Sequence, residues 1–488
     1  MSSESTPKDE TPTTRNVNRF ADVTRNISVL FVGTLVQKVT GAIAFMIFVR
    51  YIGEVGTGKY AMANSFTALF AMGADLGLGL FAVRAVSKDQ STAAKYLGNI
   101  VIMRLALAAI VLVITGISAV VIGTPRDTLV ILLLVAASTF LVQIGNGFRW
   151  TFPAFQKMQY EAVIISAESL LMLGVGSLVL VMGYGLVEFT LVRVIFSFLT
   201  LIFTIWLTVT RITRPLLQLD LKFCKDLILK TRPFMLIMIF GQVYFNLDIV
   251  LLNYFKGDIE TSWYNVAFRY VFMLQMIPML FNQTTFPAMV DAAADSAEAL
   301  TRVAKRTYRF MIIIVLGIGV MTTVYALPIV RYIASSEFDE SAPILSLLIW
   351  MQVILAITTV SNNLAMACNR ERTVVKVTGV GLLINLILNL ALIPEWGAMG
   401  AVWAAIVATG IAGIWMMKEV QQFIEGFSFQ GIWLRPILAS AGAVCIALAI
   451  DGIHVFGGLA ITLIGYAVIL YLIKAIPEQD MRLLRKIV

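Results

Sequence analysis

The amino-acid sequence predicts an all-α polytopic membrane protein with about fourteen transmembrane helices. Of its 488 residues, 59% are hydrophobic and only 14% are charged, and the mean hydropathy is +0.87. Soluble chains carry about 25% charged residues, so the composition excludes an ordinary soluble protein. Apolar stretches of about 20 residues recur along the chain, and each is long enough to cross a hydrocarbon core of about 30 Å.

Short polar connections separate these stretches, which are the predicted spans. They lie at residues 27–49, 59–82, 97–122, 128–148, 161–182, 187–209, 233–254, 264–287, 309–330, 342–366, 374–393, 397–417, 433–450 and 456–474. The N-terminal segment "MSSESTPKDETPTTRNVNRF" is too polar to form a core and does not suit a cleaved signal peptide. We therefore expect six regions: a disordered tail (1–26), an N-terminal six-helix bundle (27–210), a basic linker (211–232), a C-terminal six-helix bundle (233–418), an additional helix pair (433–474) and a tail (475–488).

The positive charges predict the orientation in the membrane, since Lys and Arg in short loops stay on the cytoplasmic side. Most of the 37 Lys and Arg residues fall in the two tails and the alternate loops on the same side as these tails. The opposite loops hold only Lys59, Arg126, Lys256 and Arg331. Both termini of a multi-pass plasma-membrane protein are therefore predicted to be cytoplasmic. The net charge of +8 needs no nucleic-acid partner, because inner basic segments attract anionic lipid headgroups.

An internal repeat relates the two predicted bundles. "YIGEVGTGKYAMANSF" and "YFKGDIETSWYNVAFRY" are both outer turns followed by a Tyr that opens the next helix. "FPAFQKMQYEAVIISAESLL" and "LAMACNRERTVVKVTGVGLL" follow the fourth and tenth spans, and "GYGLVEFTLV" and "EWGAMGAVWA" keep the same spacing. Six helices separate the copies, so both halves run in the same direction across the membrane. Some transporters place the substrate path between such parallel repeats.

Four segments resemble the multidrug/oligosaccharidyl-lipid/polysaccharide (MOP) exporter superfamily, and within it the flippases for polyprenyl-linked oligosaccharides. They are "YIGEVGTGKYAMANSF", "MGADLGLGLFAVRAVSKD", "NLDIVLLNYF" and "WYNVAFRYVFMLQMIP". The resemblance covers about residues 20–420 and implies alternating access between two helical bundles, which moves a lipid-diphosphate-linked glycan from the inner to the outer leaflet. Fourteen helices are similar to lipid II flippases and some archaeal glycan flippases, whereas many flippases for surface polysaccharide have twelve.

Lys38 is the most unexpected charge, because it lies about 16 Å into the first span at 1.5 Å per residue. A lysine at that depth costs about 2.5–3.5 kcal/mol on insertion scales. We expect it to face a water-filled cavity, where its ammonium group would bind the cargo diphosphate. An internal ion pair with Asp75 or Asp248 is the alternative that stays open.

Two arginines are further candidate cavity cations. Arg269 lies about 8 Å into the eighth span, where the resemblance implies a cavity-facing arginine; extension of its side chain to the membrane surface is the alternative. Arg193, in "EFTLVRVIF", has a similar depth and less support. Arg104 is expected to extend toward the cytoplasmic surface, and Arg50 to act as an interfacial anchor.

Two acids and several amides complete the candidates. Asp248 and Asp75 are predicted as charge partners or coupling-ion sites, and for Asp248 we favour pairing because an isolated buried charge is costly. Gly73 and Gly77, on either side of Asp75, form a G-x-x-x-G pair that indicates close helix packing. Four amides have two equal interpretations, a sugar path or interhelical hydrogen bonds: Gln143, Asn146, Asn385 and Asn389.

No catalytic, metal or cofactor motif is found in the sequence. The single His454 and the scattered Cys224, Cys368 and Cys445 predict neither a metal site nor a disulfide. The sequence has no P-loop, so the chain is not expected to consume ATP.

Three functions compete, with the flippase first. A MATE-like exporter of drugs or organic cations would need cavity acids, and a membrane glycosyltransferase or ligase would need larger outer loops or a carboxylate pair. The expected partners of the flippase are a polyprenyl-diphosphate-linked glycan, membrane lipids, and the glycan polymerase or glycosyltransferase machinery.

Overall fold

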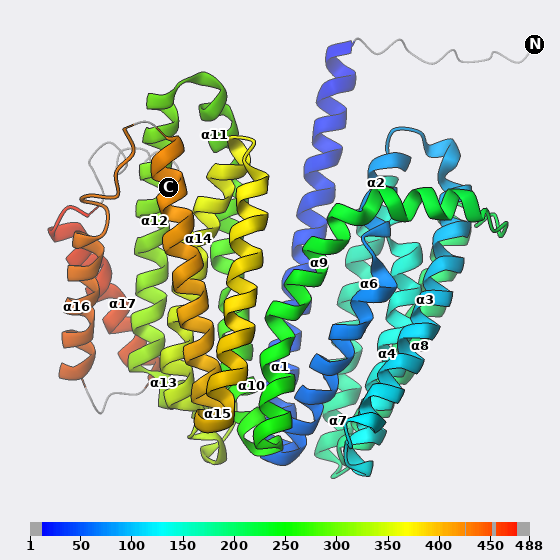
Figure 1. The fold of residues 1–488 in the computed structure, drawn as a ribbon, viewed down its shortest axis with the longest axis horizontal. Coiled ribbons are helices and arrows are strands. Elements are labelled where there is room, and N and C mark those ends of the chain that lie inside the picture. Colours follow the sequence, from blue (N-terminus) through cyan, green and yellow to red (C-terminus); the bar gives the residue numbers. More distant parts are fainter. Residues whose placement is uncertain (1–11, 425, 451–454, 476–488) are drawn as a thin grey trace, which may run out of the picture. The chain divides into compact units, whose positions relative to one another are not determined.

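The computed structural model describes residues 12–424, 426–450 and 455–475, and this described part contains helices and no strand (Figure 1). Eight of its helical segments are long and apolar enough to cross a membrane, and two shorter apolar helices lie near the C-terminus. Two of the eight, Ser28–Val86 and Glu371–Phe423, have 59 and 53 residues. Each is long enough for two crossings, so the fold class predicted from the sequence is confirmed.

The chain forms two compact units. Unit 1 contains Met1–Tyr51 and Phe66–Ile239, and unit 2 contains Ile52–Ser65 and Phe240–Val488. The predicted N-terminal bundle is therefore interrupted, since the outer turn after the first span belongs to unit 2.

Unit 1 is built around four long helices. In chain order its elements are α1 (Pro12–Asp75), which continues through the segment assigned to unit 2, α2 (Leu78–Val86), η1 (Gln90–Thr92), α3 (Ala93–Val121), α4 (Arg126–Arg149), α5 (Thr151–Ala154), α6 (Met158–Leu171), the π-helical turn η2 (Met172–Gly176), α7 (Ser177–Val181), α8 (Leu186–Arg211) and the part of α9 (Leu221–Lys256) up to Ile239. Helix α4 packs against α3 and α8 (Figure 1). Leu97, Ile100 and Phe148 are buried in the core between these helices.

Unit 2 is built around α14, which packs against α10, α11, α12 and α15. Its elements are the end of α9 (Leu221–Lys256), α10 (Asp258–Leu274), α11 (Met276–Asp295), α12 (Ala297–Val324), α13 (Ala326–Ile333), η3 (Ser336–Phe338), α14 (Ser341–Ala367), α15 (Glu371–Phe423), α16 (Leu434–Ala449) and α17 (Val455–Leu472). Helices α16 and α17 pair with each other and pack against α12 (Figure 1). The Tyr466 hydroxyl donates a hydrogen bond of 2.8 Å to the Ile313 carbonyl, which ties α17 to α12.

Two glycines show the repeat in three dimensions. Gly53 bends α1 with φ 71° and ψ −174°, and Gly257 separates α9 from α10 with φ 81° and ψ −168°. A positive φ of this kind favours glycine, which has no Cβ. Each of these glycines is followed seven residues later by the tyrosine of the repeated motif, Tyr60 or Tyr264. The equal conformation of the two turns supports the duplication inferred from the sequence.

Several boundaries differ from those predicted. Helix α1 begins at Pro12, so residues 12–26 are helical and are not a disordered tail. Proline is tolerated in the first turn of a helix, and extending an existing helix needs no new nucleus. Helix α9 begins at Leu221, so only the first half of the predicted linker 211–232 is non-helical. The second span ends at Asp75, because Leu76 and Gly77 adopt positive φ values. His454 lies outside the described residues.

Candidate functional site

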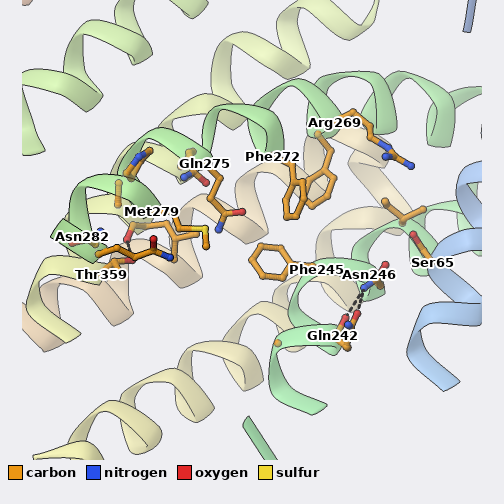
Figure 2. Close-up of a pocket in the computed structure, with 18 of the residues that line it drawn as sticks. Ser65, Gln242, Phe245, Asn246, Arg269, Phe272, Gln275, Met279, Asn282 and Thr359 are labelled. Carbon is orange, nitrogen blue, oxygen red and sulfur yellow. Dashed lines mark hydrogen bonds between the residues drawn. The ribbon is translucent and has the colours of Figure 1, made fainter. Parts of the chain in front are cut away.

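A cavity of about 830 Å³ lies within unit 2 (Figure 2). Its wall comes from residues 60–65 of α1 and from α9, α10, α11 and α14. Gly58 positions the α1 segment, because a Cβ at this residue would lie 1.9 Å from the carbonyl oxygen of Asp258. The Trp263 indole donates a hydrogen bond of 2.6 Å to the Glu54 carboxylate. This bond joins α10 to the same segment of α1.

Amide side chains dominate the polar lining of this cavity. Nine of its 26 described lining residues carry a carboxamide: Asn64, Gln242, Asn246, Asn265, Gln275, Asn282, Gln283, Gln352 and Asn363. Arg269 is the one charged side chain among these 26 residues, and none of them is Asp or Glu. A carboxamide both donates and accepts hydrogen bonds. The wall can therefore bind neutral hydroxyl or amide groups along its length and an anion at one place.

An aromatic ladder, which we define as Tyr264, Phe268 and Phe272, lies along one face of α10. The Tyr264 and Phe268 rings stack with centroids 5.9 Å apart and an interplanar angle of 16°. The Phe268 and Phe272 rings stack at 6.2 Å and 21°. Phe245 of α9 meets Phe272 edge to face at 5.9 Å. Tyr264 is only 1% exposed and anchors the ladder, whereas Phe272 is 40% exposed and lines the cavity.

The helix period explains why α10 and α11 supply so much of the wall. Their lining residues recur every three or four positions, at 265, 268/269, 272, 275, 278/279, 282/283 and 286/287. This spacing keeps one face of a helix toward the cavity. Asn363 of α14 donates a hydrogen bond of 3.2 Å to Asn282 Oδ1 and joins the α14 wall to this face.

Of the three predicted cavity cations, the structure places Arg269 on this cavity. Lys38 is an exposed side chain of α1 in unit 1, and it is not among the lining residues. Arg193 is half-buried on α8 in unit 1, near enough to Glu168 for an electrostatic interaction. The binding of cargo by Lys38 and Arg193 stays a prediction.

Arg104 does not extend to a surface as expected. Its side chain is 2% exposed and forms an ion pair with Asp75 inside unit 1. Arg104 Nη1 also donates a hydrogen bond of 3.3 Å to the Gln143 carbonyl. A carboxylate within reach makes pairing preferable to a long extended side chain, because each buried charge would otherwise lack a partner. The partner that the structure shows for Asp75 is therefore Arg104.

Asp248 belongs to a buried polar cluster in unit 2. It is 6% exposed and accepts hydrogen bonds from the Tyr264 hydroxyl (3.2 Å) and from Asn389 Nδ2 (2.6 Å). Asn389 Nδ2 also donates to Asn385 Oδ1 at 3.1 Å. Asn389 Oδ1 is buried and has no hydrogen-bond partner among the described residues. A carboxylate with an unpaired amide oxygen beside it is suited to a small cation or a proton.

The amides that line the cavity are not those singled out in the sequence. Asn385 and Asn389 hydrogen-bond within the Asp248 cluster. Gln143 donates a hydrogen bond to the Ala71 carbonyl, and Asn146 donates one to Gln143. None of these four residues lines the cavity. Gln143 and Asn389 form interhelical hydrogen bonds, whereas the bonds of Asn146 and Asn385 lie within α4 and α15. The three-to-four-residue spacing of Arg269, Phe272, Gln275, Met279 and Asn282 was the sequence signal for the actual wall.

A second group of charges in unit 1 was also missed in the sequence. Arg149 donates hydrogen bonds to both carboxylate oxygens of Glu161, the shortest of them 2.5 Å. Glu168, about two helical turns beyond Glu161 on α6, interacts electrostatically with Arg149 and Arg193. Glu168 lies inside the predicted fifth span, and an acid at that depth was a signal available in the sequence.

Comparison with protein families finds two matching models. The model described as "Polysaccharide biosynthesis protein" matches residues 23–293, and the MatE model matches residues 233–391. One similar curated protein is an uncharacterized membrane protein of Methanocaldococcus jannaschii, 22% identical over 194 residues. That alignment covers 39% of this chain and 38% of the length of the relative.

Solved structures show the same fold at low identity. The lipid II flippase MurJ in an inward closed conformation is 16% identical, with a TM-score of 0.74, and the match covers 90% of this chain and 97% of MurJ. An inward-facing multidrug resistance MATE transporter of the MOP superfamily is 15% identical, with a TM-score of 0.59, over 82% of this chain and all of the transporter. A MATE transporter of Vibrio cholerae has a TM-score of 0.54 and 15% identity, over 85% of this chain and 99% of its own.

Proposed function

Since the chain belongs to the polysaccharide biosynthesis protein family within the MOP superfamily, we propose that it is a flippase for a polyprenyl-diphosphate-linked oligosaccharide. The cargo moves from the inner to the outer leaflet by alternating access between the two helical bundles. The protein performs no covalent chemistry on this cargo. Its site of action is the plasma membrane, with both termini in the cytoplasm. The orientation can be tested with a cysteine introduced at Gln218 and an impermeant thiol reagent added to intact cells. Labelling of this cysteine from outside would contradict the orientation.

The observation that carries the proposal is the charge of the unit 2 cavity. Its described lining has one arginine and no carboxylate. An arginine can hold a phosphate with two parallel hydrogen bonds, which suits a diphosphate cargo. An exporter of organic cations would need the opposite charge, and a glycosyl-transferring enzyme would need a carboxylate pair. The cavity therefore favours the flippase over both alternatives.

The buried Asp248 cluster supports a coupling site for the transport cycle. A proton or a monovalent cation bound between Asp248 and the unpaired Asn389 Oδ1 would compensate two electrostatically costly groups. Tyr264 connects this cluster to the cavity, because its hydroxyl donates to Asp248 and its ring stacks on Phe268. Occupation of the cluster would thus change the position of the aromatic ladder.

The test is transport by purified protein in liposomes. We expect translocation of a fluorescent polyprenyl-diphosphate oligosaccharide and none of a cationic dye. Arg269→Gln should reduce lipid translocation by about tenfold or more, since it removes one charge-assisted hydrogen-bonded contact of about 1.5–3 kcal/mol. Arg331→Gln is the matched control, because Arg331 is an exposed arginine outside the cavity.

Transport of the dye without transport of the lipid would contradict the proposal and favour the exporter. Unchanged lipid transport by a well-expressed Arg269→Gln protein would remove Arg269 from the site.

Glycan polymerase and glycosyltransferase machinery are the partners that we propose to supply and receive the cargo, because a translocated intermediate must be made on one side and used on the other.

A further inference from the structure

The wall formed by α10 and α11 changes its chemistry in an ordered way along the cavity. In Figure 2, Arg269, Ser65 and Asn246 lie toward one end, and Gln275, Met279, Asn282 and Thr359 lie toward the other. Phe272 and Phe245 lie between the two groups. From Arg269 to Asn282 the helical rise corresponds to about 20 Å, which is longer than a single sugar ring. The cavity thus offers an anion-binding end, an aromatic middle and an amide-rich end.

The aromatic middle has the properties of a stacking platform. The Phe268 and Phe272 rings are nearly parallel, at 21°, and Phe245 packs edge to face at 5.9 Å from Phe272 and fixes its orientation. The buried Tyr264 holds the other end of the ladder. The face of an aromatic ring is negative, and it attracts the weakly positive C–H groups on the apolar face of a pyranose.

The amide-rich end has the properties of a hydroxyl-binding surface. A sugar hydroxyl is both a donor and an acceptor, and a carboxamide offers both functions. Gln275, Asn282 and Thr359 lie at this end in Figure 2, Asn363 hydrogen-bonds to Asn282, and none of these four residues carries a charge. An acidic sugar would call for further cations and an amino sugar with a free amine would call for a carboxylate, so this composition suits uncharged sugars.

We propose that the aromatic ladder and these amides form a sugar-binding track, in which an uncharged pyranose next to the diphosphate stacks on Phe272 and later sugars hydrogen-bond to the amides of α11 and α14. Arg269 binds the diphosphate at the start of the track. The inference rests on the proposed function and deepens it, because the protein then selects the glycan as well as the lipid diphosphate.

Binding by the purified full-length protein in nanodiscs tests the track. The probes are geranyl diphosphate, geranyl diphosphate carrying one N-acetylglucosamine, and free N,N′-diacetylchitobiose. The measured quantity is the sugar increment, defined as the ratio of Kd for geranyl diphosphate to Kd for its glycosylated form. We expect an increment of about tenfold in the unmodified protein, as one stacked ring with accompanying hydrogen bonds provides.

Phe272→Leu should bring the increment close to one and leave the Kd of geranyl diphosphate within about twofold, since leucine keeps apolar volume but has no π face. The separate variant Phe272→Tyr should keep the increment of the unmodified protein, because tyrosine has an aromatic face. Arg269→Gln should weaken both diphosphate probes by the same factor and leave the increment unchanged.

Phe203→Leu is the matched control. Phe203 is 38% exposed and stacks on Trp206 at 5.8 Å and 24°, but it lies on α8 in unit 1, outside the cavity. Its substitution should leave every Kd unchanged. Thermal unfolding of each variant shows whether a loss of binding follows from a loss of folding.

An increment that survives in a folded Phe272→Leu protein overturns the sugar track. Equal weakening of the sugar-free and glycosylated probes by Phe272→Leu also overturns it, because the ring would then contact the prenyl chain. Failure of the proposed function has a different signature: neither diphosphate probe binds. In that case Phe272-dependent binding of chitobiose still supports the track, and Phe272-independent or absent binding overturns it.

Discussion

Unit 1 and unit 2 both hold charged side chains within membrane-spanning helices, and they use them differently. In unit 1, Arg104 is buried against Asp75, and Arg149 holds Glu161 with three hydrogen bonds. In unit 2, Arg269 is exposed and lines a cavity whose other described polar groups are neutral. A charge buried against a carboxylate on another helix joins those helices, whereas a charge on a cavity wall lies where a ligand can reach it.

The comparison refines the general expectation that intramembrane charges are functional. In the sequence, candidate charges are chosen by their depth in the predicted spans. Arg104 and Arg269 lie at similar depths, each measured from the nearer end of its own span. Their surroundings separate them: a carboxylate on a neighbouring helix for Arg104, and an amide-lined cavity for Arg269. The predictions below test this difference, in order of decreasing effect.

The largest effect is expected from Asp75→Asn in unit 1. The change leaves the buried Arg104 without its carboxylate partner, and breaking a buried ion pair costs about 3–5 kcal/mol. We expect a marked loss of folded protein and a lower Tm in detergent. The double variant Asp75→Asn with Arg104→Gln should recover much of the loss, since no charge is then isolated. A single variant as stable as the unmodified protein would show that the pair does not hold the helices together.

An intermediate effect is expected from Asp248→Asn, which tests the second polar cluster of unit 2. Asparagine keeps the side-chain size and an acceptor for Tyr264 and Asn389 but removes the charge. We expect normal folded amounts, transport lowered by about tenfold, and loss of the dependence of transport on an imposed sodium or proton gradient. Transport should be measured in vesicles with each gradient set separately. Gradient-dependent transport by Asp248→Asn would exclude this cluster as the coupling site.

The smallest effect is expected at the exposed pair between α13 and α14. Arg331 donates hydrogen bonds to both carboxylate oxygens of Asp339, and this hydrogen bonding holds the pKa of Asp339 below its ordinary value of 3.8. A lowered carboxyl pKa contributes stability above the ordinary value, and this contribution is lost as the pH falls through the lowered one. Asp339→Asn should lower Tm slightly at pH 7, and the difference should disappear toward about pH 2. A difference that grows in acid would contradict this sign.

Much of the fold could be predicted from the sequence because the membrane imposes it. A backbone in hydrocarbon must satisfy its own hydrogen bonds, so apolar stretches of about 20 residues become helices. The bends at Gly53 and Gly257 followed from the repeated turn motif, and both adopt nearly the same conformation. The helix ends were less predictable. Helices α1 and α9 continue beyond the apolar stretches, since a helix extends through polar residues without a new nucleus.

The sequence by itself therefore determined the helical membrane fold, the duplication, the family and the choice of Arg269 as a candidate. Only the tertiary structure decided which charges are paired and which amides face the cavity. The physical reason is that hydropathy reports whether a side chain suits the membrane, but not which neighbouring helix it meets. Asp75 and Arg104 are 29 residues apart and Asp248 and Asn389 are 141 apart, and contacts over such separations arise only from the packing of the helices.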